Sequence, residues 1–203
     1  MIDVALLGTG GMMPMPERFL SSMLLRINGR LILVDCGEGT QVTLKMLGWG
    51  FKAIDTICFT HYHADHISGL PGMLLTIGNS GRTEPVKLIG PPGLKKVVEG
   101  LRLIFPELPF KLEYIEIDNV DCVIDFNDFS LKANEGDHRI KCLSYRFDIS
   151  RKGKFSVEKA KTLGLPVNMW SILQKGGTVE YNGKIYTSDM AVSYTHLRAH
   201  ETC

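Results

Sequence analysis

The sequence predicts a layered α/β domain, and three observations support this class. Apolar, β-branched runs alternate with stretches of helical periodicity through the first half of the chain, and from about residue 112 the pattern is mostly β. The 203 residues are 44% hydrophobic and 22% charged, which is ordinary for a globular protein. A chain of this length can bury one substantial core.

The first half of the chain reads as strands that alternate with helices. Residues 4–8 form an apolar run that stops at a glycine-rich turn. Two further strands flank Asn28-Gly29, a dipeptide that favours a hairpin because both residues tolerate positive φ. Helical spacing and a glycine stop mark residues 40–48. Residues 53–59 are rich in β-branched side chains and run directly into the segment THYHADH.

Further helices and strands are predicted from residue 69 onward by the same patterns of apolar residues. A helix is expected over GLPGMLLTIGN (69–79), which has Pro71 near its first turn. Strand and then helix follow once more in VKLIG and PPGLKKVVEGLRLIF. Four short strands come next, in the segments LEYIEI, DCVIDF, FSLKAN and KCLSYRF.

Bulk properties exclude several classes of protein. The net charge of +1 gives no overall attraction to nucleic acid or membranes, so a polyanion would need a local basic patch. No apolar run approaches a membrane span, and the N-terminus lacks a basic leader region. The five cysteines are widely spaced without a C-x-x-C pair, which indicates reduced thiols in a cytoplasmic protein.

Charge is unevenly distributed along the second half. Residues 107–128 hold seven acids and one base, and residues 139–161 hold eight bases and two acids. Either segment could be a solvated face. The basic segment could instead contact phosphates.

The densest group of metal-ligand types is His61, His63, Asp65 and His66. His61 and His63 point to the same side of an extended backbone, and a following turn can bring Asp65 and His66 back toward them. Three imidazoles and a carboxylate suit zinc. Four such residues do not easily surround one tetrahedral ion at this spacing, so two adjacent ions are the more natural interpretation. A pair of this kind serves phosphoester displacement.

The motif H-x-H-x-D-H resembles the signature of the metallo-β-lactamase superfamily. Within it, the segments LLGTGGMMPMPERFLSS, LVDCGEGTQ, FTHYHADHISGLPGMLLTI, LIGPPGL and LPVNMWSILQKGGTV resemble the ribonuclease Z family, from about residue 2 to 190. The resemblance implies an αββα sandwich, here incomplete because its second half is missing. It also implies an insertion at about 149–178 that grips tRNA, although Leu165-Pro166-Val167-Asn168 stands where many members have a Gly-Pro-rich loop.

The resemblance also implies roles for individual residues. His61, His63 and His138 would hold one zinc, and Asp65 and His66 a second, with Asp65 placed for proton transfer. The substrate-binding residues would be Arg18, Arg151, Lys152 and Lys154. Asp35 would either orient a ligand or bond backbone amides of its own turn. Gly8, Gly10 and Gly11 could cradle a phosphate or simply make a tight turn.

The implied activity is a zinc-dependent endoribonuclease, a hydrolase with two Zn²⁺ per subunit. Hydroxide formed between the ions would attack the phosphodiester at the 3′ trailer of precursor tRNA and leave a tRNA 3′-hydroxyl. The resemblance implies a homodimer when the protein is intact and no membrane partner. Two alternatives stay open: a lactamase-fold hydrolase of a small ester or phosphodiester, and a non-catalytic tRNA-binding fragment.

The C-terminal segment SYTHLRAHETC carries His196 and His200, whose spacing on a helix would suit zinc. They could replace the bridging Asp and last His that the family supplies from later sequence. We favour another interpretation, since residues 192–202 match, in one frame, the translation of a transposase adapter used in DNA library preparation. The expected domains are therefore 1–191, a partial metallo-β-lactamase domain, and 192–203, a non-native tail. We expect this chain to bind zinc poorly, to lack activity, and to leave part of an inner sheet face uncovered.

Overall fold

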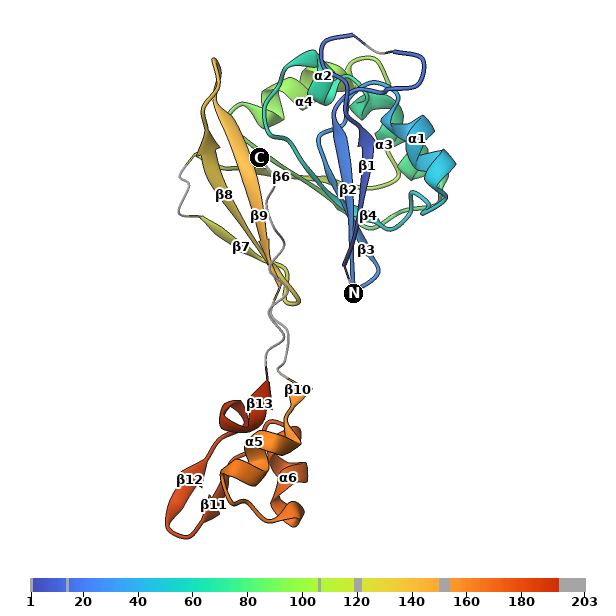
Figure 1. Cartoon of the computed structure of the whole chain (residues 1–203). Helices are drawn as coiled ribbons and strands as arrows, with labels where there is room; N and C mark the ends of the chain where they lie inside the picture. Colours follow the sequence, from blue (N-terminus) through green and yellow to red (C-terminus); the bar gives the residue numbers. More distant parts are fainter. Residues whose placement is uncertain (1, 14, 106, 119–121, 150–153, 194–203) are drawn as a thin grey trace. The chain divides into compact units, whose positions relative to one another are not determined.

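The structure is a computed structural model that describes residues 2–13, 15–105, 107–118, 122–149 and 154–193 (Figure 1). The chain divides into two compact units, Met1–Ile149 and Ser150–Cys203. The expected adapter-derived tail lies outside the described residues from residue 194 onward, and its origin stays a prediction. None of the described helices is long and apolar enough to cross a membrane.

The larger unit is built on a six-stranded sheet with the order β1-β2-β3-β4-β5-β6. Its strands are β1 (Ile2–Gly8), β2 (Ser22–Ile27), β3 (Arg30–Val34), β4 (Ile54–Cys58), β5 (Val86–Gly90) and β6 (Leu112–Glu116). The first three are antiparallel, and β3 to β6 are parallel. The predicted hairpin is confirmed, because Asn28 and Gly29 join β2 to β3 with φ of 49° and 88°.

Three helices share one core with the first face of this sheet: α1 (Thr40–Leu47), α3 (Leu70–Asn79) and α4 (Leu94–Arg102). Fully buried side chains from both layers form this core, among them Leu33, Leu44, Ile57, Met73, Leu74 and Leu88. Parallel strands covered on both faces are expected to be buried along most of their length, and four of the five residues of β4 and of β5 are buried. The predicted helices over 40–48, 69–79 and 91–105 are confirmed within a few residues.

A three-stranded antiparallel sheet packs against the other face of the large sheet. It consists of β7 (Val123–Asp125), β8 (Ser130–Gly136) and β9 (Cys142–Asp148). A second core lies between the sheets, with Ile32, Val34, Cys58 and Ile89 on one side and Phe129, Leu131, Ala133 and Leu143 on the other. The described residues of this unit therefore form three layers, in the order helices, large sheet and small sheet (Figure 1).

One end of the inner face of the large sheet is exposed. Val4 pairs with Leu25, which belongs to the inter-sheet core, so both lie on the inner face. The side chains of Val4 and Leu6 are nevertheless 57% and 68% exposed. The sequence led us to expect such an uncovered inner face, and β1 provides it.

The smaller unit has its own core. It contains β10 (Lys154–Phe155), α5 (Val157–Thr162), α6 (Val167–Gln174), β11 (Val179–Tyr181), β12 (Lys184–Tyr186), a 3₁₀ turn η1 (Ser188–Ala191) and β13 (Val192–Ser193). Ser156 caps α5 by accepting a hydrogen bond from the backbone N–H of Lys159. Leu165, Leu173, Val179 and the fully buried Ala160 and Ala191 close the core.

Candidate metal centre

The site is formed where β4 leaves the large sheet. The strand ends at Cys58, and residues 60–63 follow without regular structure. His63 has an extended backbone, with φ of −66° and ψ of 148°, and forms the N-cap of the one-turn helix α2 (Ala64–Ile67). The chain therefore turns sharply between His63 and His66, as the sequence led us to expect.

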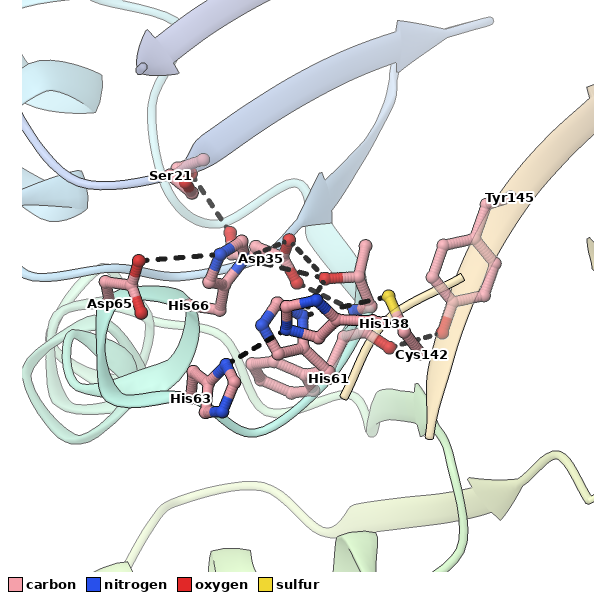
Figure 2. Close-up of polar contacts among 12 residues, drawn as sticks. Ser21, Asp35, His61, His63, Asp65, His66, His138, Cys142 and Tyr145 are labelled. Carbon is pink, nitrogen blue, oxygen red and sulfur yellow. Dashed lines mark hydrogen bonds and ion pairs between the residues drawn. The ribbon is translucent and has the colours of Figure 1, made fainter. Parts of the chain in front are cut away.

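Three imidazoles converge at this turn (Figure 2). One nitrogen from each of His61, His63 and His138 lies within 4.8 Å of the others. His61 is buried, whereas His63 and His138 are exposed. His138 comes from the loop between β8 and β9, so residues of both sheets contribute to the cluster. Nitrogens this close together could hold one metal ion, and the structure brings together the three histidines that the resemblance assigned to one zinc.

Asp65 and His66 form a second pair of donors beside the cluster. The Oδ2 atom of Asp65 lies 3.7 Å from Nε2 of His66, and the rings of His61 and His66 are 4.1 Å apart. The backbone N–H of Met12 donates to Asp65 Oδ2 at 3.1 Å. Partial burial acts to raise the pKa of Asp65, but this hydrogen bond and the neighbouring imidazoles lower it overall.

Asp35 lies behind the imidazoles and has a left-handed backbone, with φ of 58°. Its Oδ2 atom lies 2.7 Å from Nδ1 of His66, and its Oδ1 atom accepts the backbone N–H of Thr60 at 2.8 Å. Burial acts to lower the pKa of His66, but the hydrogen bond and charge of Asp35 outweigh it and raise that pKa. These contacts support the interpretation that Asp35 orients His66. The backbone amide that its carboxylate accepts from belongs to Thr60, after β4, and not to the turn of Asp35 itself.

The pKa of His61 moves in the opposite direction. Burial is the largest cause, and the charge of nearby His66 adds to it, so the pKa of His61 is lowered. A lowered pKa keeps the imidazole neutral and its lone pair available to a metal ion.

The chemistry of these donors fits one zinc ion well. Three imidazole nitrogens lie within 4.8 Å of one another, and three protein ligands are the number found in a zinc site that keeps a position open for water or substrate. Asp65 and His66 would contribute one oxygen and one nitrogen to a second ion. Within the described residues, no other cluster of three such groups meets the same distance limit.

Glycines allow the backbone to close around the site. A Cβ on Gly8 would lie 1.8 Å from the carbonyl oxygen of Leu20, and one on Gly37 would lie 2.4 Å from that of Asp65. Gly10 donates its N–H to the carbonyl oxygen of Phe19, and a Cβ on Gly10 would lie 3.0 Å from that oxygen. A Cβ on Gly11 would meet only Asp65 Oδ2, at 3.8 Å. Close backbone packing therefore requires glycine at Gly8, and phosphate binding by this turn stays a prediction.

The remaining predicted residues make other contacts, belong to the smaller unit or fall outside the described part of the chain. Arg18 is exposed, and its guanidinium donates to the carbonyl oxygen of Thr9 at 2.8 and 3.1 Å. Lys154 lies in β10 of the smaller unit. Arg151, Lys152, His196 and His200 fall outside the described residues.

Thr60 is a further residue of the site that the sequence did not lead us to expect. Its hydroxyl lies within 3 Å of both Asp35 and His61. The only available signal was its position, immediately before the first histidine of the motif.

Comparison with known proteins gives consistent results. The family model described as "Anti-Pycsar protein Apyc1" matches residues 2–165. Ribonuclease Z of Lachnospira eligens is 53% identical over 192 residues, which cover 95% of this chain and 63% of that protein. Ribonuclease Z of Agathobacter rectalis is 52% identical with the same coverage. The chain therefore spans less than two thirds of the length of these relatives.

Solved structures show the same fold. The short form of human tRNase Z aligns with a TM-score of 0.64 and 32% identity, over 73% of this chain and 65% of that one. A metallo-β-lactamase fold protein from Bacillus subtilis aligns with a TM-score of 0.58 and 20% identity, over 72% of this chain and 57% of that one. The predicted fold class is confirmed, and the aligned chains again extend beyond the matched part.

Proposed function

The chain belongs to the family described as anti-Pycsar protein Apyc1 and is a ribonuclease Z relative of metallo-β-lactamase fold, and we propose that the whole protein trims precursor tRNA. The proposed activity is zinc-dependent removal of the 3′ trailer, which leaves a tRNA 3′-hydroxyl. The observation that carries the proposal is the convergence of His61, His63 and His138. Identity to ribonuclease Z supports the choice of substrate.

His61, His63 and His138 would hold the first zinc, and Asp65 and His66 would contribute to the second. When bound, zinc lowers the pKa of water and offsets negative charge that develops on a phosphoryl group. Asp65 is proposed to accept a proton close to the reacting phosphate. Its lowered pKa keeps the carboxylate ionised, although it also makes the carboxylate a weaker base. Its hydrogen bond from Met12 holds the carboxylate in place.

The basic residues are proposed to hold the tRNA. Arg18 belongs to the same loop as Met12, and its bonds to Thr9 fix the shape of that loop. Arg151, Lys152 and Lys154 are proposed to contact tRNA phosphates as part of an insertion at about 149–178. Two other bases of the segment 139–161 are already engaged, since Arg146 bonds Asp148 and Lys159 bonds the carbonyl of Val192. We further propose a cytoplasmic homodimer for the whole protein.

A cleavage assay tests the proposal. Precursor tRNA with a 3′ trailer is incubated with this chain and with a chimera in which the last third of Lachnospira eligens ribonuclease Z follows residue 190. We expect the chimera to release the trailer in the presence of Zn²⁺, and its Asp65→Asn variant to lose this activity.

Other outcomes would favour the alternatives. Hydrolysis of a small phosphodiester without selectivity for tRNA would point to a general lactamase-fold hydrolase. Retained tRNA binding without cleavage, unaffected by a chelator or by Asp65→Asn, would point to a binding fragment.

Arg18→Ala should weaken tRNA binding. It should also reduce the slope of the logarithm of the binding constant against the logarithm of the salt concentration, by roughly the amount that one phosphate contact contributes.

A further inference from the structure

A single hydroxyl connects the buried carboxylate to the imidazole cluster. The Oγ1 atom of Thr60 lies 2.8 Å from Asp35 Oδ2 and 2.9 Å from His61 Nδ1. The same Oδ2 atom lies 2.7 Å from Nδ1 of His66. We propose that Thr60 is a positioning residue that transmits the orientation imposed by Asp35 to His61. This inference rests on the proposed metal centre.

The direction of each hydrogen bond follows from the groups involved. An ionised carboxylate only accepts hydrogen bonds, so the Thr60 hydroxyl donates its proton to Asp35. A hydroxyl has one proton and two lone pairs, so what it presents to His61 is a lone pair. His61 must then donate from Nδ1. The proton therefore sits on Nδ1 of His61, and Nε2 keeps its lone pair.

His66 also carries its proton on Nδ1, and here Asp35 makes the contact directly. Its Nδ1 atom faces Asp35 without an intermediary and donates to the carboxylate. The Thr60 hydroxyl also lies 3.5 Å from His66 Nδ1, but the carboxylate of Asp35 is much nearer, at 2.7 Å. One aspartate thus selects the tautomer of two histidines, one of each proposed metal subsite, directly for His66 and through Thr60 for His61. Partners of this kind fix the ring orientation and the available nitrogen of a metal-binding histidine.

The backbone holds Thr60 in this position. Its N–H donates to Asp35 Oδ1 at 2.8 Å, and its carbonyl accepts from the N–H of Leu143 at 2.8 Å. Leu143 belongs to β9, so the residue is held between the two sheets. A competing partner of His61 Nδ1 is the Cys142 thiol, but it lies farther away, at 4.0 Å.

Imidazole tautomers can be read directly by long-range ¹H–¹⁵N NMR correlation. The experiment uses the metal-free 203-residue chain at alkaline pH, where imidazoles are neutral. We expect His61 of the unmodified chain to carry its proton on Nδ1. In Thr60→Val, the His61 resonances should shift toward the Nε2-protonated form, while His66 keeps its proton on Nδ1. Thr60→Ser should restore the original His61 spectrum, because it restores the hydroxyl.

Two variants serve as matched controls. Thr56 is a buried threonine of β4 whose hydroxyl bonds Asp55, so Thr56→Val should leave the His61 tautomer unchanged. Cys142→Ala should also leave it unchanged. If Thr60→Val folds poorly, Thr60→Ala replaces it, because it removes the same hydroxyl. The spectrum of the unmodified chain needs no variant, and it tests directly whether His61 carries its proton on Nδ1.

Four results would overturn the inference: Nε2 protonation of His61 in the unmodified chain, no change in Thr60→Val, no restoration in Thr60→Ser, or a tautomer change in Cys142→Ala. A joint change of His61 and His66 in a folded Thr60→Val chain would also count against it, because His66 is expected to keep its tautomer through direct contact with Asp35. No metal or RNA is present in this measurement. A failure to bind zinc or cleave tRNA would therefore count against the proposed function alone.

Discussion

The Nε2 atom of His138 lies 3.2 Å from the Nδ1 atom of His63, although 75 residues separate them. The two rings meet edge to face, with centroids 5.1 Å apart. The contact joins the loop after β4 of the large sheet to the β8–β9 loop of the small sheet. Packing of the two sheets, rather than local sequence, therefore completes the imidazole cluster.

We expect His63→Ala and His138→Ala each to weaken zinc binding by at least about 100-fold. Loss of a partner that merely orients a metal ligand costs about 10–100-fold, and loss of a ligand should cost no less. Competition with a chelating dye measures the dissociation constant. Arg139→Ala, a change at an exposed neighbour of His138, is the matched control and should bind zinc as the unmodified chain does. Equal affinity in all variants would rule out the cluster as the binding site.

The zinc content of the purified chain should be below two ions per molecule. The first subsite has three imidazoles, whereas Asp65 and His66 supply only two donors to the second. Atomic emission measures the content, and we expect the chimera with the C-terminal third of a relative to hold more zinc. A chain that already held nearly two ions and cleaved tRNA well would contradict this expectation.

The tail histidines should not contribute to the metal site. The double variant His196→Ala, His200→Ala is expected to bind zinc with unchanged affinity, because we interpret that segment as adapter-derived. The same dye competition measures it, beside His138→Ala as the positive comparison. A loss of affinity similar to that of His138→Ala would instead make the tail part of the site.

Substitution of Asp35 separates its backbone role from its hydrogen bonds. Asp35→Asn should lower the free energy of unfolding by about 1.5–3 kcal/mol, because hydrogen bonds to a charged group are weakened. Asp35→Ala should cost roughly 1–2 kcal/mol more, since Asn tolerates the left-handed backbone and Ala does not. Urea unfolding measures both values. Equal losses would show that the φ of 58° stores little strain.

Gly37 should be sensitive to any added side chain. A Cβ there would lie 2.4 Å from the backbone oxygen of Asp65 and 2.5 Å from Leu20 Cβ, so we expect Gly37→Ala to destabilise the fold by about 1–3 kcal/mol. Gly100 provides the control, because it lies in α4 and a Cβ there would meet nothing within 4 Å. Gly100→Ala should stabilise the helix by about 0.5–1 kcal/mol. If both variants had the same unfolding midpoint, close packing at Gly37 would not matter.

Local sequence predicted much of what the structure contains. Asn28-Gly29 predicted the first hairpin because few other dipeptides accept positive φ twice. The β-branched and apolar runs of β4 and β5 predicted strands, and the spacing from His61 to His66 predicted a turn that gathers metal donors. These features depend on residues within a few positions of one another, so they can be read without knowledge of the fold.

Only the tertiary structure decided which distant groups complete the site. Nothing in the sequence around Thr60 shows that its hydroxyl lies between Asp35 and His61, or that Asp35 reaches His66. The sheet pairing of β3 with β4 brings Asp35 to the turn, and the packing of β9 against Thr60 brings the loop of His138 there. The sequence alone determined which residues could bind a metal. Three-dimensional packing determined which of their nitrogens face one another. The physical reason is that hydrogen-bond partners separated by 25 to 81 residues meet only in the folded chain.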